Sequence, residues 1–284
     1  MTNGAFCKNK VLQGDSAEIL STLQDNIFDC CVTSPPYYGL RDYGNEKQIG
    51  LEDTPEQYIE RLVKVFEQVK RTLKDNGTLW LNIGDTYENK NLIGIPWLLA
   101  FALKKSGWYL RQDIIWHKPN PMPESVKDRC VKSHEYIFLL SKSQKYYFDY
   151  KAIQENAICK DDRRAGEGRI EYDGKRASGE DDKAQQSFVK ITDKRNKRDV
   201  WTVTTKAVKD AHFATYPEDL IKPCILAGCK VGGVVLDPFF GSGTTGRVCI
   251  KTNRNYFGIE LNPDYIDIIN KRTDNIQLTF EGLI

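Results

Sequence analysis

The pattern of hydrophobic positions divides the first part of the chain into alternating strands and helices. Residues Phe28–Thr33 form a short apolar run that stops at Ser34-Pro35-Pro36, because proline cannot continue a hydrogen-bonded ladder. Thr54-Pro55-Glu56-Gln57 has the form of a helix capping box, and apolar residues recur at helical spacing between positions 59 and 73. Asn76-Gly77 is expected to stop this helix. We predict a further helix over 96–105 and strands over 78–83, 108–116 and 136–140.

The pattern fails in the middle of the chain and then returns. Over residues 159–198 apolar positions thin out, and Gly, Lys, Arg, Asp and Glu follow neither a helical nor a strand period. Helices are then predicted over 217–227, 244–252 and 263–274, and strands over 233–236 and 255–260. This alternation predicts an α/β fold with a mixed, mostly parallel sheet covered by helices. The expected organisation is two halves of one domain, residues 1–150 and 211–284, separated by an insert over 151–210.

Composition limits the class of protein without naming an activity. With 284 residues, 40% of them hydrophobic, the chain can bury one substantial core, and a net charge of +2 means that any nucleic-acid surface requires local clustering of Lys and Arg. The eight cysteines include Cys30 and Cys31, which a strand would point to opposite faces as buried thiols. Neither the cysteines nor the three histidines have metal-ligand spacing, so we expect no metal and no disulfide framework. A cytoplasmic protein without a signal peptide or membrane span is expected.

A glycine-rich segment, residues 236–246, connects a predicted strand to a predicted helix. Its glycines allow the backbone to approach a bound nucleoside, and Glu260, at the end of the following strand, can accept both hydroxyls of a ribose. Gly241, Gly243 and Gly246 also satisfy the G-x-G-x-x-G pattern, so an NAD-dependent oxidoreductase is an alternative, as is a glycine turn without a ligand. However, a dinucleotide fold needs several further strands downstream, and only one helix follows Glu260. The rest of the sheet must therefore come from upstream, in a permuted order.

The segment Thr33-Ser34-Pro35-Pro36-Tyr37 suits the methylation of an exocyclic base amine. Such an amine is a poor nucleophile because its lone pair is delocalised into the ring, and two acceptors can draw the nitrogen toward tetrahedral geometry. The Ser34 hydroxyl and the Pro35 carbonyl can each accept one amine hydrogen, while Pro35 and Pro36 hold both acceptors rigid. Tyr37 offers a flat face on which a base flipped out of the duplex can stack, a contribution of about 1–3 kcal/mol.

Two other functions compete with methylation of an exocyclic amine. Methylation at cytosine C5 needs a cysteine nucleophile, and the only Pro-Cys pair, Pro223-Cys224, falls inside a predicted helix. Residues 35–38 also fit a P-P-x-Y ligand of a WW domain, which would make the segment a non-enzymatic binding motif. Such ligands normally lie in disordered stretches, whereas this one directly follows a predicted buried strand.

Together, the segments 33–37 and 237–244 resemble the catalytic and cofactor motifs of the β-class amino-methyltransferases of bacteria and phages, in that class's order. The resemblance extends over nearly the whole chain outside the insert. It implies a permuted, Rossmann-like sheet of seven strands and S-adenosyl-L-methionine as the cofactor. Catalysis is assigned to Ser34, Pro35, Pro36 and Tyr37. The expected cofactor contacts are Asp15, Phe213, Thr215, Asp237, Phe239, Gly241, Ser242, Gly243, Thr244 and Glu260.

The same resemblance implies the partners. The insert is the target-recognition region in this family, so double-stranded DNA is the expected substrate. Candidate contacts to phosphates or guanines are Arg163, Arg164, Lys194, Arg195, Lys197 and Arg198. A companion restriction endonuclease and either a monomer or a homodimer are compatible with the family.

The identity of Ser34, the residue before the two prolines, indicates which base is methylated. Family members with serine at the position of Ser34 mostly modify N4 of cytosine, although some modify N6 of adenine, which remains the alternative. RNA or protein-glutamine methyltransferases share the cofactor loop, but they usually carry N-P-P-Y downstream of it. Here the order is reversed and serine replaces asparagine, which favours a DNA methyltransferase.

Overall fold

The chain forms two compact units in a computed structural model that describes residues 8–40, 42, 44–45, 47–157, 194–205 and 216–274. The larger unit comprises residues 1–149 and 198–284, and the smaller unit comprises residues 150–197. The smaller unit contains a 3-10 turn, Lys151–Ile153, and an antiparallel pair formed by β8 (Glu155–Asn156) and β9 (Lys194–Arg195). All other helices and strands below belong to the larger unit.

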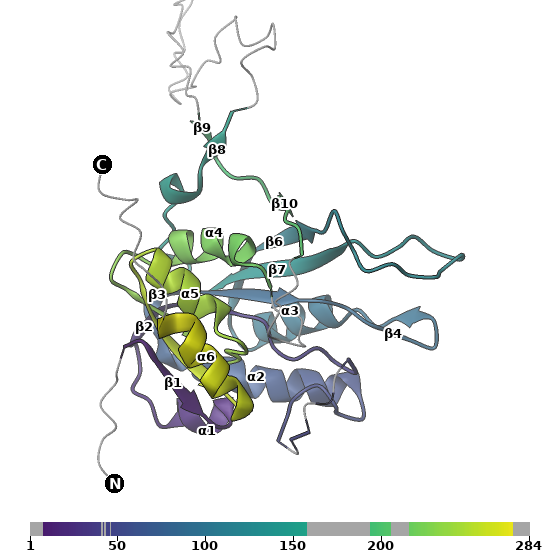
Figure 1. The fold of residues 1–284 in the computed structure, drawn as a ribbon, viewed down its shortest axis with the longest axis horizontal. Coiled ribbons are helices and arrows are strands. Elements are labelled where there is room, and N and C mark those ends of the chain that lie inside the picture. Colours follow the sequence, from purple (N-terminus) through teal and green to yellow (C-terminus); the bar gives the residue numbers. More distant parts are fainter. Residues whose placement is uncertain are drawn as a thin grey trace, which may run out of the picture. The chain divides into compact units, whose positions relative to one another are not determined.

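One sheet runs through the larger unit and takes its strands from both ends of the chain (Figure 1). In spatial order its strands are β1 (Lys10–Gln13), β12 (Asn255–Glu260), β11 (Val234–Asp237), β2 (Phe28–Thr33), β3 (Leu73–Ile83), β7 (His134–Ser141), β6 (Tyr109–His117) and β10 (Val200–Thr202). Only β7 is antiparallel to its neighbours. The predicted permuted, mostly parallel α/β architecture is confirmed, and β10 adds an eighth strand at one edge.

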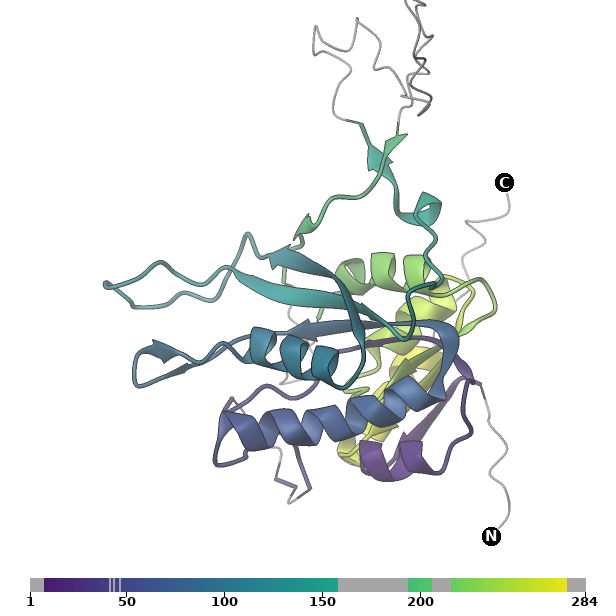
Figure 2. The ribbon, with the colours of Figure 1, turned by 180° about the vertical axis from the view of Figure 1, so that it is seen from behind.

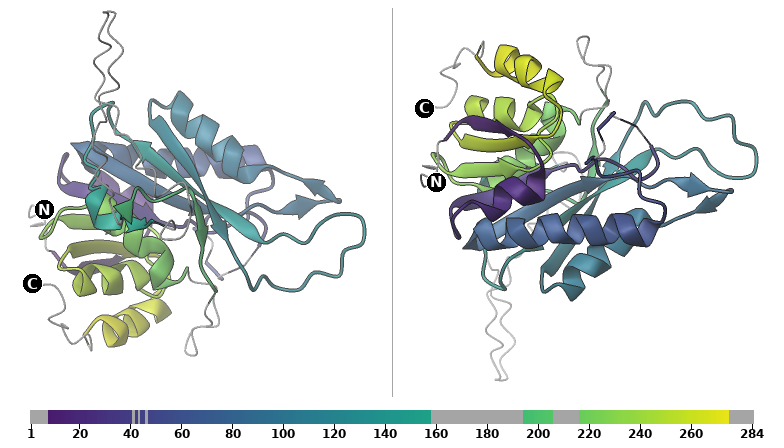
Figure 3. Two further views of the ribbon diagram at one scale, coloured as in Figure 1. Left: turned by 90° about the horizontal axis from the view of Figure 1, so that it is seen from above. Right: turned by 90° about the horizontal axis from the view of Figure 1, so that it is seen from below.

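Helices cover both faces of this sheet (Figure 3). One face carries α1 (Ser16–Ser21), α2 (Pro55–Thr72) and α3 (Ile95–Lys105), with α2 and α3 in front in the view of Figure 2. The other face carries α4 (Glu218–Gly228), α5 (Thr244–Lys251) and α6 (Asp264–Asp274). A short hairpin, β4 (Tyr87–Glu88) with β5 (Asn91–Leu92), extends beyond the sheet. None of the helices in the described part of the chain has the length and hydropathy needed to cross a bilayer.

The adjacent cysteines of β2 demonstrate the two-sided burial of the sheet. Cys31 belongs to the core that α1, α2 and α3 form with the sheet, whereas Cys30 lies beside Gly228 of α4 on the other face. Both thiols are fully buried and free, as the sequence predicts. Pro223 and Cys224 lie inside α4, with Cys224 buried, so the argument against C5 chemistry is also confirmed.

The end of α2 differs from the prediction. Thr54 caps the helix through a bond from the Gln57 amide to its hydroxyl (3.3 Å), but α2 ends at Thr72, not at Asn76-Gly77. The buried Leu73 adopts an extended backbone and pairs with Phe28, so β3 begins there. Gly77 lies within β3, where a Cβ would approach the Lys74 carbonyl oxygen to 2.9 Å. This glycine therefore serves close packing within β3 and not helix termination.

The segment between β11 and α5 is held against β12 by an aromatic ring. Phe240 is buried and stacks on Tyr256, with ring centroids 5.4 Å apart. A Cβ added at Gly258 would lie 2.4 Å from Phe240 Cδ2, and one added at Gly246 would lie 2.8 Å from its Cζ. The two glycines are therefore required because the ring occupies the space that a side chain would need.

Gly258→Ala is expected to lower the free energy of unfolding by about 1–3 kcal/mol, because the added methyl group collides with the Phe240 ring. Thermal and urea unfolding would measure the loss. The double variant Gly258→Ala/Phe240→Leu should cost less than the sum of the two single changes, since the smaller side chain vacates the contested space. Strict additivity would contradict this packing account.

Candidate active site

The predicted catalytic and cofactor segments leave the sheet side by side. Strands β2 and β11 are parallel neighbours, with Cys31 opposite Leu236, so the segments that begin at Ser34 and Pro238 emerge at the same edge. The Thr33 hydroxyl at the end of β2 donates to Asp237 Oδ1 at the end of β11 (2.6 Å). The ends of these two strands therefore adjoin. In an open α/β sheet this edge is where ligands bind.

Asp237 holds the two segments together through both of its carboxylate oxygens. The side chain is fully buried, and the Phe239 amide donates to Oδ1 (3.1 Å) in addition to Thr33. Oδ2 accepts from the hydroxyls of Thr245 (2.6 Å) and Tyr216 (2.9 Å). Burial raises the pKa of Asp237, and these four hydrogen bonds oppose that rise. All four donors belong to the protein, so Asp237 shapes the loop; the predicted contact of this residue with a cofactor remains a prediction.

The glycine segment turns sharply above Asp237. Gly241 and Gly243 have φ angles of 51° and 83°, in the left-handed region that favours glycine, and Gly243 caps α5. Beside Gly241 the position of a Cβ is open, with nothing within 4 Å. Ser242 is buried, and its hydroxyl and carbonyl oxygens both accept from Arg272 of α6. The backbone of the turn is thus fixed while space remains next to it.

Glu260 borders the same turn from the end of β12. Its carboxylate oxygens accept from the amides of Gly241 (2.7 Å) and Asn262 (2.9 Å), and the residue is 9% exposed. Burial raises the pKa of Glu260 to about 7, against the effect of the two backbone hydrogen bonds. On the neighbouring β1 side, Asp15 caps α1 by accepting from the Glu18 amide (2.9 Å). The strand ends thus collect Asp15, Asp237 and Glu260 at one edge.

These features fit an adenosine-containing cofactor. A carboxylate oxygen retains lone pairs after accepting one amide hydrogen, so Glu260 can still accept ribose hydroxyls. Phe239 is half-buried and meets Phe66 edge to face, with ring centroids 6.4 Å apart. Phe213 and Thr215, also predicted to contact the cofactor, lie outside the described residues. Within the described part of the chain, no cluster of His, Cys, Asp or Glu is arranged to hold a metal ion.

The S-P-P-Y segment is anchored by groups that the sequence did not single out. Tyr37 donates its hydroxyl hydrogen to Glu135 Oε2 (2.6 Å), and Asn82 Nδ2 donates to the Tyr37 oxygen (2.8 Å) and to Ser34 Oγ (3.3 Å). Tyr58 donates to the Pro36 carbonyl (2.8 Å). Burial, and then the nearby charge of Glu135, raise the pKa of Tyr37, which keeps its hydroxyl protonated.

The Tyr37 ring is closely packed on one side. A Cβ at Gly84 would lie 2.7 Å from Tyr37 Cε2, so only glycine fits beside it. The segment is therefore part of the folded core edge, not an extended ligand of the kind that WW domains bind. Stacking of a base on Tyr37 remains a prediction.

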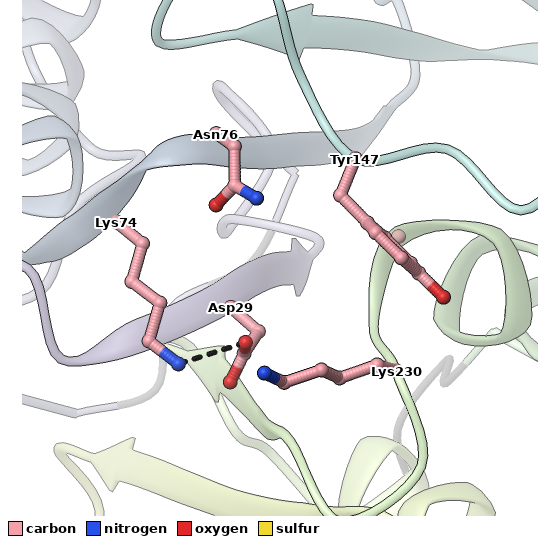
Figure 4. A pocket seen from close by; sticks show the side chains of 6 residues that line it. Asp29, Lys74, Asn76, Tyr147 and Lys230 are labelled. Carbon is pink, nitrogen blue, oxygen red and sulfur yellow. Dashed lines mark hydrogen bonds and ion pairs between the residues drawn. The ribbon is translucent and has the colours of Figure 1, made fainter.

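A polar pocket at the opposite edge of the sheet does not belong to this site. Asp29, near the start of β2, accepts from Lys74 (2.8 Å; Figure 4). It also accepts from the Val234 amide (2.9 Å) at the start of β11. The remaining residues that line this pocket are Asn76, Tyr147, Gly228 and Lys230. These strand beginnings lie at the other end of β2 and β11 from Ser34 and Pro238.

The predicted DNA contacts are only partly described. Lys194 and Arg195 form β9 in the smaller unit, which also contains Lys197, whereas Arg198 belongs to the larger unit. Arg195 Nε donates to Glu155 of β8 (3.0 Å). Arg163 and Arg164 lie outside the described residues.

Comparison with known proteins agrees with this geometry. A family model described as DNA methylase, N6_N4_Mtase, matches residues 28–271. The Type II methyltransferase M.Cfr9I of Citrobacter freundii is 46% identical over 291 residues, covering 92% of this chain and 86% of that protein. M.SmaI of Serratia marcescens is 46% identical over 292 residues, covering 93% and 90%. The chain belongs to the N4/N6 DNA methyltransferase family.

Solved structures of DNA methyltransferases share the fold. PvuII DNA methyltransferase (cytosine-N4-specific) superposes with a TM-score of 0.70 at 18% identity, over 95% of this chain and 89% of that one. A DNA modification methylase from Thermus thermophilus, solved with S-adenosyl-L-methionine, gives 0.65 at 22% identity, over 93% of each chain. The cofactor of this methyltransferase is S-adenosyl-L-methionine and its substrate is DNA. The oxidoreductase and WW-ligand alternatives are therefore wrong.

Asp237→Asn is expected to destabilise the methyltransferase by about 3–5 kcal/mol, because an amide group would face buried donors where a carboxylate oxygen now accepts. Urea unfolding would measure the loss. The matched change Asp75→Asn, at an exposed carboxylate near the opposite edge, should cost less than about 1 kcal/mol. Equal stability of the two variants would contradict the role given to Asp237.

Proposed function

We propose that this DNA methyltransferase transfers the methyl group to N4 of cytosine. The observation that carries the proposal is the position of Ser34 at the edge shared with the cofactor loop, next to the Thr33–Asp237 hydrogen bond. Serine at this position favours cytosine N4 by the family resemblance. N6 of adenine is the alternative, and the same residues would serve it.

The chain's own residues would act by orientation and by accepting hydrogen bonds. The bound cofactor supplies an electrophilic methyl group on a sulfonium. Ser34 Oγ and the Pro35 carbonyl would each accept a hydrogen of the target amine, which directs the nitrogen lone pair toward the cofactor loop. The amine then needs no general base before attack, and the extra proton passes to water once the nitrogen has acquired the methyl group. Pro35 and Pro36 restrict the backbone, so the acceptors are in place before the base arrives.

Ser34→Ala should reduce the rate of methyl transfer at least about 100-fold, because one of two amine acceptors is lost, while cofactor affinity changes little. The measurement is incubation with DNA and labelled cofactor, followed by mass spectrometry of the nucleosides. Wild-type protein is expected to yield N4-methylcytosine. Ser106→Ala, at the end of α3, is the matched control and should leave the rate unchanged.

Two results of this experiment would count against the proposal. N6-methyladenine as the product would assign the target base to the alternative. Full activity of Ser34→Ala would contradict the catalytic role given to the S-P-P-Y segment, whichever base is modified.

We further infer that Glu260 binds the cofactor ribose, together with the open space at Gly241. The remaining proposed cofactor contacts are those predicted from the sequence: Asp15, Phe213, Thr215, Asp237, Phe239, Ser242, Gly243 and Thr244. Because hydroxyl donors favour the ionised carboxylate, protons compete with the cofactor for Glu260.

Cofactor affinity should therefore weaken as the pH falls through the Glu260 pKa of about 7. Between pH 8 and pH 6 the dissociation constant should rise about tenfold, since the ionised fraction falls by that factor. Titration calorimetry at several pH values would measure it. In Glu260→Gln, binding should be weak and should lose this slope; an unchanged slope would exclude Glu260 as the titrating group.

Target recognition is assigned to the insert, residues 151–210. One support is the strand pair of the smaller unit, which carries Lys194 and Arg195. The other is the place of the insert in the sequence, between the two halves of the methyltransferase domain. Arg163, Arg164, Lys197 and Arg198 remain proposed contacts. The Type II relatives favour a companion restriction endonuclease. Cytoplasmic location and a monomer or homodimer remain predictions.

A further inference from the structure

Five polar side chains from four separate segments meet at the S-P-P-Y motif. Ser34 and Tyr37 follow β2, Asn82 lies near the end of β3, Glu135 near the start of β7, and Lys118 directly after β6. They meet because β7 runs antiparallel to β3 and β6, which brings its beginning to the edge where the other two strands end. Apart from the Ser34–Tyr37 contact, these interactions join residues far apart in the sequence.

Glu135 is the only one of the five that can accept and cannot donate. Lys118 pairs with Oε1, and the two side chains are 18% and 15% exposed, so the pair is largely shielded from water. Lys118 also lies over the Trp116 ring, 4.3 Å from its centroid. Paired with this cation, the Glu135 carboxylate offers hydrogen-bond acceptors only.

The carboxylate fixes the direction of the other hydrogen bonds. Tyr37 must donate its one hydrogen to Glu135 Oε2, so the Tyr37 oxygen can only accept from its remaining neighbours. Those neighbours are Asn82 Nδ2, at 2.8 Å, and the Ser34 hydroxyl, at 3.5 Å. Asn82 Nδ2 also lies 3.2 Å from Glu135 Oε2, which keeps its amino end facing the cluster.

The orientation of Asn82 agrees with this direction. The residue is 3% exposed, and within the described part of the chain its Oδ1 has no hydrogen-bond partner. A buried acceptor without a donor is unfavourable. The amide nevertheless keeps its oxygen unsatisfied, because turning it toward Glu135 would place two acceptors against each other.

We propose that Glu135 is a positioning residue that keeps Ser34 Oγ available as a hydrogen-bond acceptor. Because Tyr37 donates to Glu135, it cannot donate to Ser34, and the Ser34 hydrogen points toward Tyr37. One lone pair of Ser34 Oγ accepts from Asn82, and the other is left for the target amine. Without the carboxylate, Tyr37 would donate to Ser34 Oγ and occupy that lone pair. The inference rests on the proposed role of Ser34 in methyl transfer.

Glu135→Gln tests the proposal, because the glutamine amide can turn its amino group toward Tyr37 and reverse the hydrogen bond. In single-turnover methylation of DNA with labelled cofactor, we expect the rate to fall at least about tenfold with an unchanged dissociation constant for the cofactor. In a Tyr37→Phe background, where no tyrosine hydrogen can be redirected, the same change should alter the rate less than about twofold. Glu124→Gln, which removes a different carboxylate, the one paired with Arg129, is the control and should have no effect.

The variants also separate this role from a purely structural one. If Glu135→Gln leaves Lys118 unpaired and prevents folding, the pair Lys118→Met/Glu135→Gln removes both charges and is compared in the same two backgrounds. Equal losses with and without the Tyr37 hydroxyl, or no loss in either, would overturn the inference. An inactive Ser34→Ala with a fully active Glu135→Gln would overturn it while the proposed function stands. Full activity of Ser34→Ala would overturn both.

Discussion

The site depends on one buried carboxylate that cannot be left unsatisfied. Asp237 receives hydrogen bonds from Thr33, Phe239, Tyr216 and Thr245, and so it joins the catalytic strand, the cofactor loop, the start of α5 and the segment before α4. Removing a charge from water is costly unless such donors replace the solvent, so the four groups must converge whenever the chain folds. Folding itself therefore fixes the distance between the proposed amine acceptors and the proposed cofactor loop.

Three carboxylates at one edge of the sheet differ because of their surroundings. Asp237 accepts hydrogen bonds from protein donors on both oxygens. Glu260 accepts from two amides but borders open space, and burial raises its pKa to about 7. Glu135 pairs with a lysine and accepts from a tyrosine hydroxyl. Their proposed roles follow from these partners. Asp237 holds the loop, Glu260 binds the ribose, and Glu135 directs the hydrogen bonds of Ser34. Identical functional groups thus acquire separate roles through burial and partners.

Periodicity and continuous apolar runs predicted most elements, because the helices bury one face over several turns and the central strands are apolar on both faces. Strands β2 and β12 were predicted with their observed bounds, and α3, α5 and α6 within a residue. β1 and α1 were missed, since four and six residues are too few to establish a period. The end of α2 was misplaced because pairing of Leu73 with Phe28, a long-range contact, takes precedence over the local turn preference of Asn76-Gly77.

The sequence by itself determined the family and the order of its motifs: serine, two prolines and tyrosine after a buried strand, then a glycine turn with a carboxylate downstream, an order that requires a permuted sheet. Only the tertiary structure identified Asn82, Lys118 and Glu135, because they come from separate strands and meet through the antiparallel direction of β7. A motif can be recognised in the sequence when its functional groups are close together along the chain. The direction of a hydrogen bond depends on which partner has no hydrogen to give, and that is decided by contacts across the sheet.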